Sequence, residues 1–489
     1  MLDIIYITTM AGLSLLGFHR FYLLMWALID ARSQTDGLSR TEIETHSTLP
    51  HVTIQLPIFN EKHVVSRLIE AVCTLDYDLT KLNIQVLDDS TDDTGVHVDR
   101  AVQYWAGRGR SIKVIRRKHR HGFKAGALEE GMTHSSDPFI AIFDADFIPE
   151  ASFLKRALAE FTEQNIGMVQ ARWSHYNRHA SLLTEAQAIL LDGHFAIEQR
   201  ARWASGAWFN FNGTAGVWRR NCILDAGGWA HETLTEDLDL SYRAQMKGWS
   251  FKYVNQLTVP SELPTSLSAF RSQQHRWAKG SIQVAQKLLL KIIHGPYSIR
   301  EKWESACHLL ANLNYLLVSM LSVCIPLLVF NETQGVLFSE FGHLFFGLGA
   351  ACFGMFYVGS QIRQQRLFRA CLLLPIVFAT GIGLCINNTK AVLEAFCGHI
   401  SPFIRTPKTG MVHDTPQSGT SYTIPTGKII HVIEYSFLCV YIACLGICIK
   451  QEQWRHLPLI ILFCAAFATP LWAQAQMLNP TGQRSRTTP

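Results

Sequence analysis

Residues 51–60 (HVTIQLPIFN), 61–75 (EKHVVSRLIEAVCTL) and 83–90 (NIQVLDDS) indicate the fold of the central part of the chain. The first and third segments have the apolar and β-branched content of buried strands, and the second has helical spacing. SIKVIRR at 111–117 and PFIAIFDAD at 138–146 predict two further strands. Strands that alternate with helices form a mostly parallel α/β sheet, and its ligands bind beyond the carboxyl ends of the strands.

Long apolar stretches lie on both sides of this α/β segment. Residues 4–29 contain one formal charge, Arg20, and predict an N-terminal membrane anchor. The later windows with few or no charges are 309–330, 341–362, 370–389, 429–449 and 456–473. Each approaches the ~20 residues that span a ~30 Å hydrocarbon core. The chain is therefore expected to be an integral membrane protein.

Basic loops set the expected orientation of these helices. Residues 361–369 (QIRQQRLFR) carry three arginines, which places them on the cytosolic side, together with the α/β domain. If residues 370–389 crossed the membrane, the basic segment 401–428 would face outside, which the positive-inside rule disfavours. We therefore expect residues 370–389 to be interfacial or re-entrant, with five spans rather than six.

The composition excludes several classes of protein. The 489 residues are 48% hydrophobic and only 17% charged, which is too apolar for a soluble or disordered protein of this size. The net charge of +5 comes without a basic tract, so no nucleic-acid partner is expected, and it fits contact with an anionic membrane surface. The 12 cysteines include no CxxC pair and indicate neither a zinc site nor a disulfide framework.

Paired aspartates follow two of the predicted strands. Asp88 and Asp89 can accept hydrogen bonds from a nucleobase or from ribose hydroxyls, although an Asp-rich turn that ends a strand has the same composition. Asp144 and Asp146 are two residues apart on an extended strand end. Both carboxylates therefore point to one side, and they can share a hard divalent cation that binds a diphosphate. A lone DxD is a weak signal, and its place after an apolar strand strengthens it.

Three polar segments can supply binding or catalytic groups. Lys124, in the helix start HGFKAGAL, suits an anion, although an ordinary glycine-punctuated helix start also explains it. Glu236 and Asp237 begin a helix in TEDLDL, where a carboxylate is either a helix cap or a general base. Residues 211–216 (FNGTAG) form a polar turn among aromatic side chains, which are either core or a sugar-binding wall.

Two basic segments lie close to the predicted membrane helices. QQHRW at 273–277 precedes a predicted amphipathic helix. Arg276 offers a planar fork to a pyrophosphate, and Trp277 offers a flat apolar face to a pyranose ring. A basic juxtamembrane helix start with an interfacial tryptophan is the alternative. FIRTPK at 403–408 is a basic loop between membrane segments, and a positive-inside anchor also explains it.

In this order and flanked by membrane segments, these motifs resemble the processive, inverting family 2 glycosyltransferases of the cellulose synthase type. Within that class the likeness is to the plant cellulose-synthase-like A and C proteins, which make β-mannan or glucomannan and the xyloglucan backbone. It is carried by IQVLDDSTD, KAGAL, AIFDADF, VQARW, FNGTAGVWR, TEDLDLSYRAQMKGW and QQHRW, and it covers residues 50–290. The resemblance implies an α/β glycosyltransferase domain of the GT-A type inserted between transmembrane helices.

The resemblance also implies roles for the candidate residues. Those that it assigns to the donor are Asp88, Asp89, Lys124, Asp144 and Arg276. Those that it assigns to the acceptor are Asn212, Gly213, Thr214, Gln273 and Trp277. Asp237, beside Glu236, would be the catalytic base, and Asp144 with Asp146 would hold Mn²⁺ or Mg²⁺. Thr406 and Lys408 would belong to a gating loop, where FIRTPK departs from the family's FxVTxK.

These patterns predict seven segments. They are an N-terminal transmembrane anchor (1–30), a cytosolic GT-A domain (31–285), an interfacial amphipathic helix (286–308), two transmembrane helices (309–362), an interfacial helix with the gating-like loop (363–428), two further transmembrane helices (429–475) and a tail (476–489). The membrane would be the bacterial inner membrane or the Golgi.

The implied activity is polymerisation of a hexose from UDP-glucose or GDP-mannose into a β-linked polysaccharide that crosses the membrane. Its partners would be the nucleotide sugar, the growing β-glycan and the lipid bilayer, and an accessory subunit is left open. One alternative is a lipid glycosyltransferase similar to ceramide glucosyltransferases, which would add a single β-sugar to a membrane lipid. The FNGTAG and KAGAL matches favour the polymerase. The other alternative is a scaffold or transporter, but transport sites lie near the bilayer midplane rather than at strand ends.

Overall fold

The computed structural model describes residues 2–36, 49–330, 342–399, 408, 410 and 428–478. A seven-stranded sheet with the order β3-β2-β1-β4-β6-β5-β7 forms the centre of the α/β segment. Its strands are β1 (Val52–Ile58), β2 (Leu82–Asp88), β3 (Ser111–Ile115), β4 (Phe139–Ile142), β5 (Ile166–His175), β6 (Gly216–Arg219) and β7 (Ser250–Ser261). The four strands that the sequence predicts are all present.

The sheet is mostly parallel, as expected. Strands β1 to β4 run parallel to one another, β5 is parallel to β7, and β6 is antiparallel to both of its neighbours. Helices α2 (Val65–Cys73), α3 (Thr94–Ala106) and α4 (Phe123–Thr133) connect the parallel strands. Parallel strands need such crossovers, so the carboxyl ends of β1, β2 and β4 meet at one edge of the sheet.

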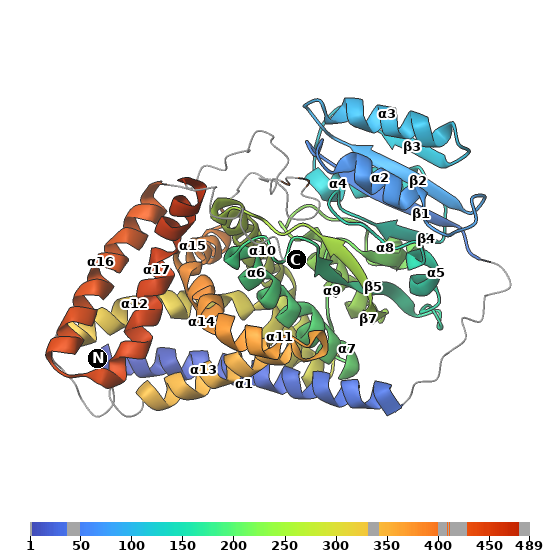
Figure 1. The fold of residues 1–489 in the computed structure, drawn as a ribbon. Helices are drawn as coiled ribbons and strands as arrows, with labels where there is room; N and C mark the ends of the chain where they lie inside the picture. The colour runs from blue at the N-terminus through green and yellow to red at the C-terminus, as the bar shows by residue number, and fades with distance from the viewer. Residues whose placement is uncertain are drawn as a thin grey trace.

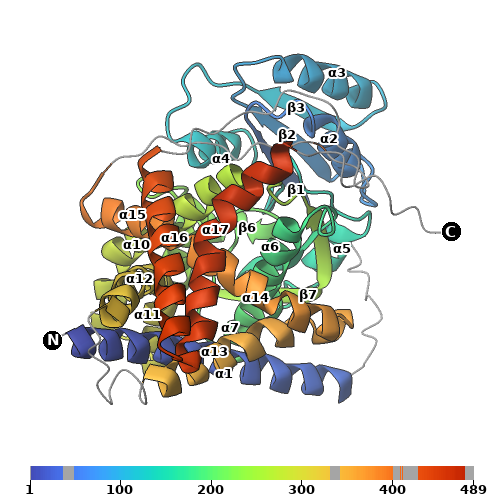
Figure 2. The same cartoon turned by 60° about the vertical axis from the view of Figure 1, so that its left-hand side comes forward.

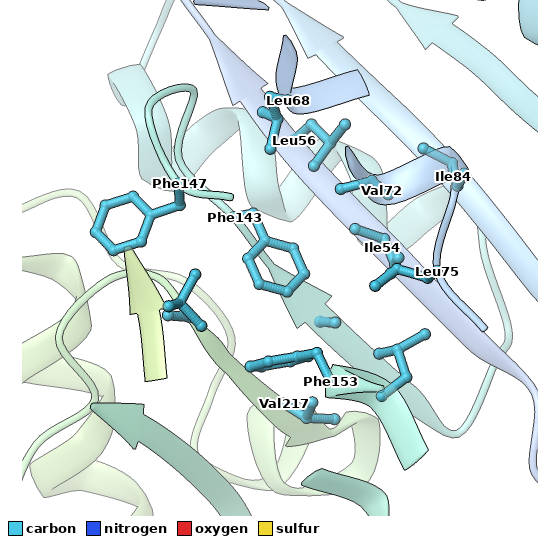
Figure 3. Close-up of a cluster of buried hydrophobic side chains, with 14 of the residues drawn as sticks. Ile54, Leu56, Leu68, Val72, Leu75, Ile84, Phe143, Phe147, Phe153 and Val217 are labelled. Atoms are coloured by element: carbon cyan, nitrogen blue, oxygen red, sulfur yellow. The ribbon is translucent and has the colours of Figure 1, made fainter. Parts of the chain in front are cut away.

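One face of the sheet is covered by α2 and an apolar cluster (Figure 3). Leu68 and Val72 lie four residues apart on one face of α2 and belong to the same buried cluster as Ile54 and Leu56 of β1. Phe143, directly after β4, lies in this cluster too and is fully buried. Full burial of each such side chain stabilises the fold by ~1.5–3 kcal/mol, so the end of β4 is held firmly where the DxD begins.

The other face of the sheet packs against α4 and α9 (Glu236–Met246). Leu128 of α4, Trp218 of β6 and Leu240 of α9 are fully buried in one cluster there. This packing places the N-terminal ends of α4 and α9 at the edge where the parallel strands end. The cluster therefore positions two helix starts that carry candidate site residues.

The apolar helices gather on one side of the sheet domain (Figures 1 and 2). They are α1 (Leu2–Asp36), α12 (Asn314–Phe330), α13 (Gly342–Gly359), α14 (Leu367–Gly383), α15 (Cys385–Phe396), α16 (Lys428–Lys450) and α17 (Leu457–Leu478). Among the described residues, five helices are long and apolar enough to cross a membrane: Leu2–Ala31, Ala311–Phe330, Leu367–Phe396, Ile429–Lys450 and Trp454–Leu471. Leu344–Gly359 is a shorter apolar helix.

This set differs from the expected spans in two ways. By length and composition, the segment α14–α15 could cross the membrane, although we expected an interfacial or re-entrant segment there. By the same criteria α13 is too short, although we expected it to be a span. Contacts with the α/β domain also indicate where α14 and α15 lie. Arg369, near the start of α14, pairs with Glu185 of α6 (Leu182–Asp192). Asn387 of α15 donates a hydrogen bond to the carbonyl oxygen of Arg271 in α10 (Leu267–His294). Both α14 and α15 therefore touch the α/β domain, and their interfacial placement stays a prediction.

Two sequence expectations about α10 are wrong. QQHRW lies inside α10 rather than before a helix, because Ser266 caps α10 seven residues before Gln273 and accepts a hydrogen bond from the Ala269 amide. The expected single helix at 286–308 is two helices, since α10 ends at His294 and α11 (Ile299–Leu309) begins after a Gly-Pro break. Proline cannot continue a helix, and Ser298 starts α11 through a capping box with Glu301.

Candidate active site

A cavity of about 200 Å³ opens at the carboxyl ends of the parallel strands, between the sheet and α10. The predicted site residues in its wall are Asp89, Lys124, Asp144, Asp146, Asn212, Gly213, Glu236, Asp237, Gln273, Arg276, Trp277 and Lys408. Asp88 and Thr214 do not line it, and Thr406 lies outside the described residues. Residues that are more than 300 positions apart in the chain thus meet at one site.

The two carboxylates of the DxD each face a lysine. Asp144 follows β4, and one of its oxygens lies 2.5 Å from the Lys124 ammonium. Asp146 accepts hydrogen bonds from the Glu262 amide at 3.1 Å and from the Lys408 ammonium at 2.7 Å. Burial raises the pKa of Asp144, while the Lys124 ammonium opposes that shift. The two aspartates therefore form an anionic pair whose charge is balanced by the lysines.

Lys124 lies in the first turn of α4 and joins two parts of the site. Its ammonium donates hydrogen bonds to Asp144 and, at 2.9 Å, to the carbonyl oxygen of Gly213. Burial acts to lower its pKa, but the carboxylates of Asp144, Glu236 and Asp237 outweigh burial and raise the pKa. The Lys124 side chain is therefore cationic at neutral pH and suits the phosphates of a donor.

Thr214 is fully buried beneath the DxD rather than in the cavity wall. Its hydroxyl oxygen accepts a hydrogen bond from the Asp144 amide at 2.8 Å. The fully buried Gln170 amide of β5 donates to the Thr214 carbonyl at 3.1 Å, and its oxygen accepts from the Asn212 amide at 2.9 Å. Thr214 and Gln170 therefore hold the turn in place. The sequence did not single out Gln170, although a glutamine in a buried strand was a signal for this role.

Glu236 and Asp237 form the first turn of α9, as the sequence predicts. Burial and the neighbouring Glu236 carboxylate together raise the pKa of Asp237 to about 7. Gly213, with φ +82°, approaches this side chain closely, since a Cβ at that position would lie 3.0 Å from an Asp237 oxygen. A carboxylate with a pKa near neutrality in a cavity suits a general base.

Gln273, Arg276 and Trp277 follow helical spacing, so all three point from one face of α10 into the cavity. Burial lowers the pKa of Arg276 to about 10, and the carboxylates of Glu236 and Asp144 oppose this shift. Arg276 remains cationic at neutral pH. The face thus combines a cation with a flat aromatic ring.

The two aspartates after β2 are paired with arginines after β3. Asp88 is buried and accepts a hydrogen bond from Arg116 at 2.9 Å. Asp89 accepts from Arg117 at 3.1 Å and reaches the cavity wall. Arg116 and Arg117 were not singled out from the sequence, although the basic end of SIKVIRR next to the acidic end of NIQVLDDS was a signal for these pairs. Asp89 is thus part of the cavity wall, and Asp88 is not.

A mostly parallel sheet with a DxD and a carboxylate-bearing helix start at its carboxyl edge defines a glycosyltransferase domain of the GT-A type. Residues 50–280 match the family described as Glycosyltransferase like family 2, and this part of the chain is a family 2 glycosyltransferase domain. The prediction of the domain's fold and family is confirmed.

Curated relatives support the resemblance to plant glycan synthases. The chain is 43% identical over 275 residues to glucomannan 4-beta-mannosyltransferase 2 of Arabidopsis thaliana, covering 55% of this chain and 52% of that protein. It is 44% identical over 252 residues to glucomannan 4-beta-mannosyltransferase 1 of Oryza sativa subsp. japonica, covering 50% and 48%. The matched region is thus about half the length of these relatives.

A solved structure shares the fold. Mannosyltransferase PcManGT from Pyrobaculum calidifontis, determined in complex with GDP-Man and Mn²⁺, has a TM-score of 0.57 and 16% sequence identity to this chain. The alignment covers 82% of this chain and 100% of that one. At this identity the similarity concerns the fold.

Proposed function

We propose that the protein is a membrane-embedded, inverting glycosyltransferase that transfers mannose from GDP-mannose to the end of a growing β-linked glycan. The observation that carries the proposal is the cavity in which Asp144, Asp237, Arg276 and Trp277 converge. It joins a basic and acidic end, suited to a diphosphate, to an aromatic wall suited to a sugar. The names of the curated relatives favour mannose, and UDP-glucose is the competing donor.

Asp237 accepts the proton of the attacking hydroxyl in this mechanism. The hydroxyl oxygen of the terminal acceptor sugar attacks the anomeric carbon of the donor, and the bond from that carbon to the diphosphate oxygen breaks. Attack from the opposite side inverts the anomeric carbon, so an α-linked donor gives a β linkage. The proton passes to an oxygen of Asp237, and Lys124 and Arg276 stabilise the charge that develops on the departing diphosphate.

Asp144 and Asp146 fit a divalent cation by their chemistry. Mg²⁺ and Mn²⁺ prefer carboxylate oxygens, and such ions are commonly held by one or two carboxylates plus substrate phosphates. Among the described residues no group of three or more His, Cys, Asp or Glu side chains could hold a metal alone, which agrees with a site that the substrate completes. When bound, the cation would neutralise the diphosphate as it leaves.

Trp277 and Gln273 would hold the acceptor, with the turn that contains Asn212 and Gly213 opposite them. The flat indole face suits the apolar face of a pyranose ring, and the Gln273 amide suits its hydroxyls. The apolar helices beside the cavity would form the path of the glycan across the membrane, with the domain on the cytosolic side. In this proposal α14 and α15 lie at the interface, and Lys408, which lines the cavity, belongs to the gating loop.

The test uses purified protein in lipid nanodiscs with Mn²⁺ and, in separate reactions, radiolabelled GDP-mannose or UDP-glucose. Products are sized before and after digestion with β-mannanase or β-glucanase. Long product from GDP-mannose that β-mannanase degrades supports the proposal. Long product from UDP-glucose would show that UDP-glucose is the donor. Small labelled product that partitions into organic solvent would show that the protein is a lipid glycosyltransferase rather than a polymerase.

A further inference from the structure

A partly buried chain of polar groups joins the N-terminal helix α1 to the side of the cavity that carries Asn212. Arg20 of α1 pairs with Glu198, which lies in the π-helix η1 (Gly193–Gln199). Glu198 also lies 3.3 Å from Arg202 and 3.2 Å from Nδ1 of His194. Nε2 of His194 lies 2.8 Å from Oδ1 of Asn212, which lines the cavity. Three contacts thus connect a charge in an apolar helix to the site.

A second branch ties the same cluster to α11. His19, next to Arg20, lies 3.2 Å from both oxygens of Glu304, and Arg202 lies 3.9 Å from Glu304. Arg202 and Glu304 are each 1% exposed. The two arginines and two glutamates balance in charge. Removing one member of such a buried set leaves a charge unpaired, so the set resists rearrangement.

Contacts with α1 and α13 hold the π-helix η1 in place. Seven residues with π-helical winding are rare in proteins, and such turns occur mostly at functional sites. Gly193 packs against α13, since a Cβ there would lie 2.6 Å from the Phe356 ring. Arg20 packs over the same Phe356 ring at 5.5 Å. Helices α1 and α13 lie side by side (Figure 1), and together they hold η1 against the domain.

His194 is in its neutral form in this setting. Burial, together with the cations Arg202 and Arg20, lowers the pKa of His194 to about 4, although the hydrogen bond with Asn212 acts to raise it. A neutral imidazole has one N–H donor. Asn210 also donates to Oδ1 of Asn212, at 3.3 Å, so this oxygen is a shared acceptor. With that N–H on Nε2, His194 donates to Oδ1 of Asn212, and Nδ1, which faces Glu198, carries the lone pair.

We propose that His194 is a positioning residue for the acceptor sugar: its Nε2–H orients the Asn212 amide, and Arg20 of the N-terminal helix neutralises Glu198, whose carboxylate would otherwise draw the ring proton to Nδ1. The inference rests on the proposed function, since it assigns the acceptor to the side of the cavity that carries Asn212. A membrane anchor alone does not need a charged residue such as Arg20. The inference gives Arg20 a role in substrate binding. The N-terminal helix is then a support of the active site and not only an anchor.

The kinetic test compares wild type, His194→Ala, His194→Gln and Arg20→Met in nanodiscs with Mn²⁺, GDP-[¹⁴C]mannose and added β-1,4-mannohexaose. Loss of one hydrogen bond predicts an about tenfold higher KM for mannohexaose in His194→Ala and Arg20→Met. The Kd for GDP-mannose stays within about twofold of wild type, because neither residue faces the donor. His194→Gln, whose amide can donate to Asn212, restores most of the acceptor affinity.

The matched control is Asp30→Asn. Asp30 also joins α1 to α7 (Arg200–Ala204), through a pair with Arg200 at 2.5 Å, and it lies ten residues further along α1 than Arg20. It is expected to lower the unfolding temperature without changing the KM for mannohexaose. An equal rise in the acceptor KM in Asp30→Asn, or an unchanged KM in His194→Ala, would overturn the inference.

Hydrogen exchange separates this inference from the proposed function, because it needs no turnover. Amides of residues 210–214 should exchange about tenfold faster in His194→Ala and Arg20→Met than in wild type, and at the wild-type rate in Asp30→Asn. Wild-type protein that transfers no mannose to mannohexaose would count against the proposed function alone. Unchanged exchange at 210–214 in both variants would overturn the inference whatever the activity.

Discussion

The Lys124 ammonium lies 2.5 Å from a carboxylate oxygen of Asp144, and it bridges that oxygen to the Gly213 carbonyl. One cation therefore connects the proposed metal-binding side of the cavity to the turn on the proposed acceptor side. Because Lys124 enters from the first turn of α4, its position is set by helix packing against the sheet rather than by a loop. The pair indicates that this lysine shares Asp144 with any divalent ion that binds.

Lys124→Met should make the protein depend on the metal for stability. The substitution leaves the Asp144 carboxylate without its ammonium partner, so we expect a lower unfolding temperature in metal-free buffer. Mn²⁺ should raise the unfolding temperature of the variant by more than that of wild type, since the ion replaces the missing charge. Thermal unfolding with and without Mn²⁺ measures both effects. Lys155→Met, which removes an exposed pair with Asp76, is the control and should respond to Mn²⁺ as wild type does.

Thr214→Val should weaken the support under the DxD. Valine has nearly the same shape but cannot accept the hydrogen bond from the Asp144 amide, and a buried unpaired amide costs ~1–3 kcal/mol in the free energy of unfolding. The KM for the donor should rise as well, because the backbone of Asp144 shifts. Thr214→Ser keeps the hydroxyl and should recover most of both losses. Equal behaviour of Thr214→Val and Thr214→Ser would contradict the role of the hydroxyl.

The sheet, the helix starts and most of the site were predictable because they depend on local patterns. β1, β2 and β4 are mostly apolar runs that end in polar groups, and parallel topology brings those ends together. The TED sequence marks its own helix start, since Thr235 directly precedes α9. Such signals lie within about ten residues of one another and need no tertiary information.

The remaining features depend on long-range packing and could not be predicted. β6 is short and is defined by its two antiparallel neighbours rather than by its own pattern. Asp88 looks like Asp89 in sequence, but in the structure Asp88 pairs with Arg116, which follows β3, and only Asp89 is in the cavity wall. Arg20 had no partner within the apolar helix, and Glu198 lies 178 positions further along the chain.

Glu236→Gln should shift the pH dependence of activity. Burial and the Glu236 carboxylate together raise the pKa of Asp237 to about 7 in wild type. Asp237 acts as a base only when deprotonated, so activity is lost as the pH falls through its pKa. Removing the Glu236 charge lowers that pKa, and the acid limb of the kcat/KM profile at fixed Mn²⁺ should move to lower pH. Glu232→Gln, at an exposed carboxylate, should leave the limb in place, and an unmoved limb in Glu236→Gln would count against the coupling.

Asp237→Asn should abolish transfer while it keeps the donor site intact. Asparagine has the same shape but cannot accept the proton of the attacking hydroxyl, and loss of a general base lowers kcat by about 10²–10⁴-fold. The Kd for GDP-mannose, measured by titration calorimetry with Mn²⁺, should stay within about threefold of wild type, because Lys124, Arg276 and the DxD are unchanged. Asp239→Asn is the matched control, since Asp239 lies two residues further along α9, pairs with Arg243 and Lys287, and is not among the residues of the cavity wall. It should retain most of the wild-type kcat. Near-normal turnover in Asp237→Asn would remove the assignment of the base and leave Glu236 as the next carboxylate to test.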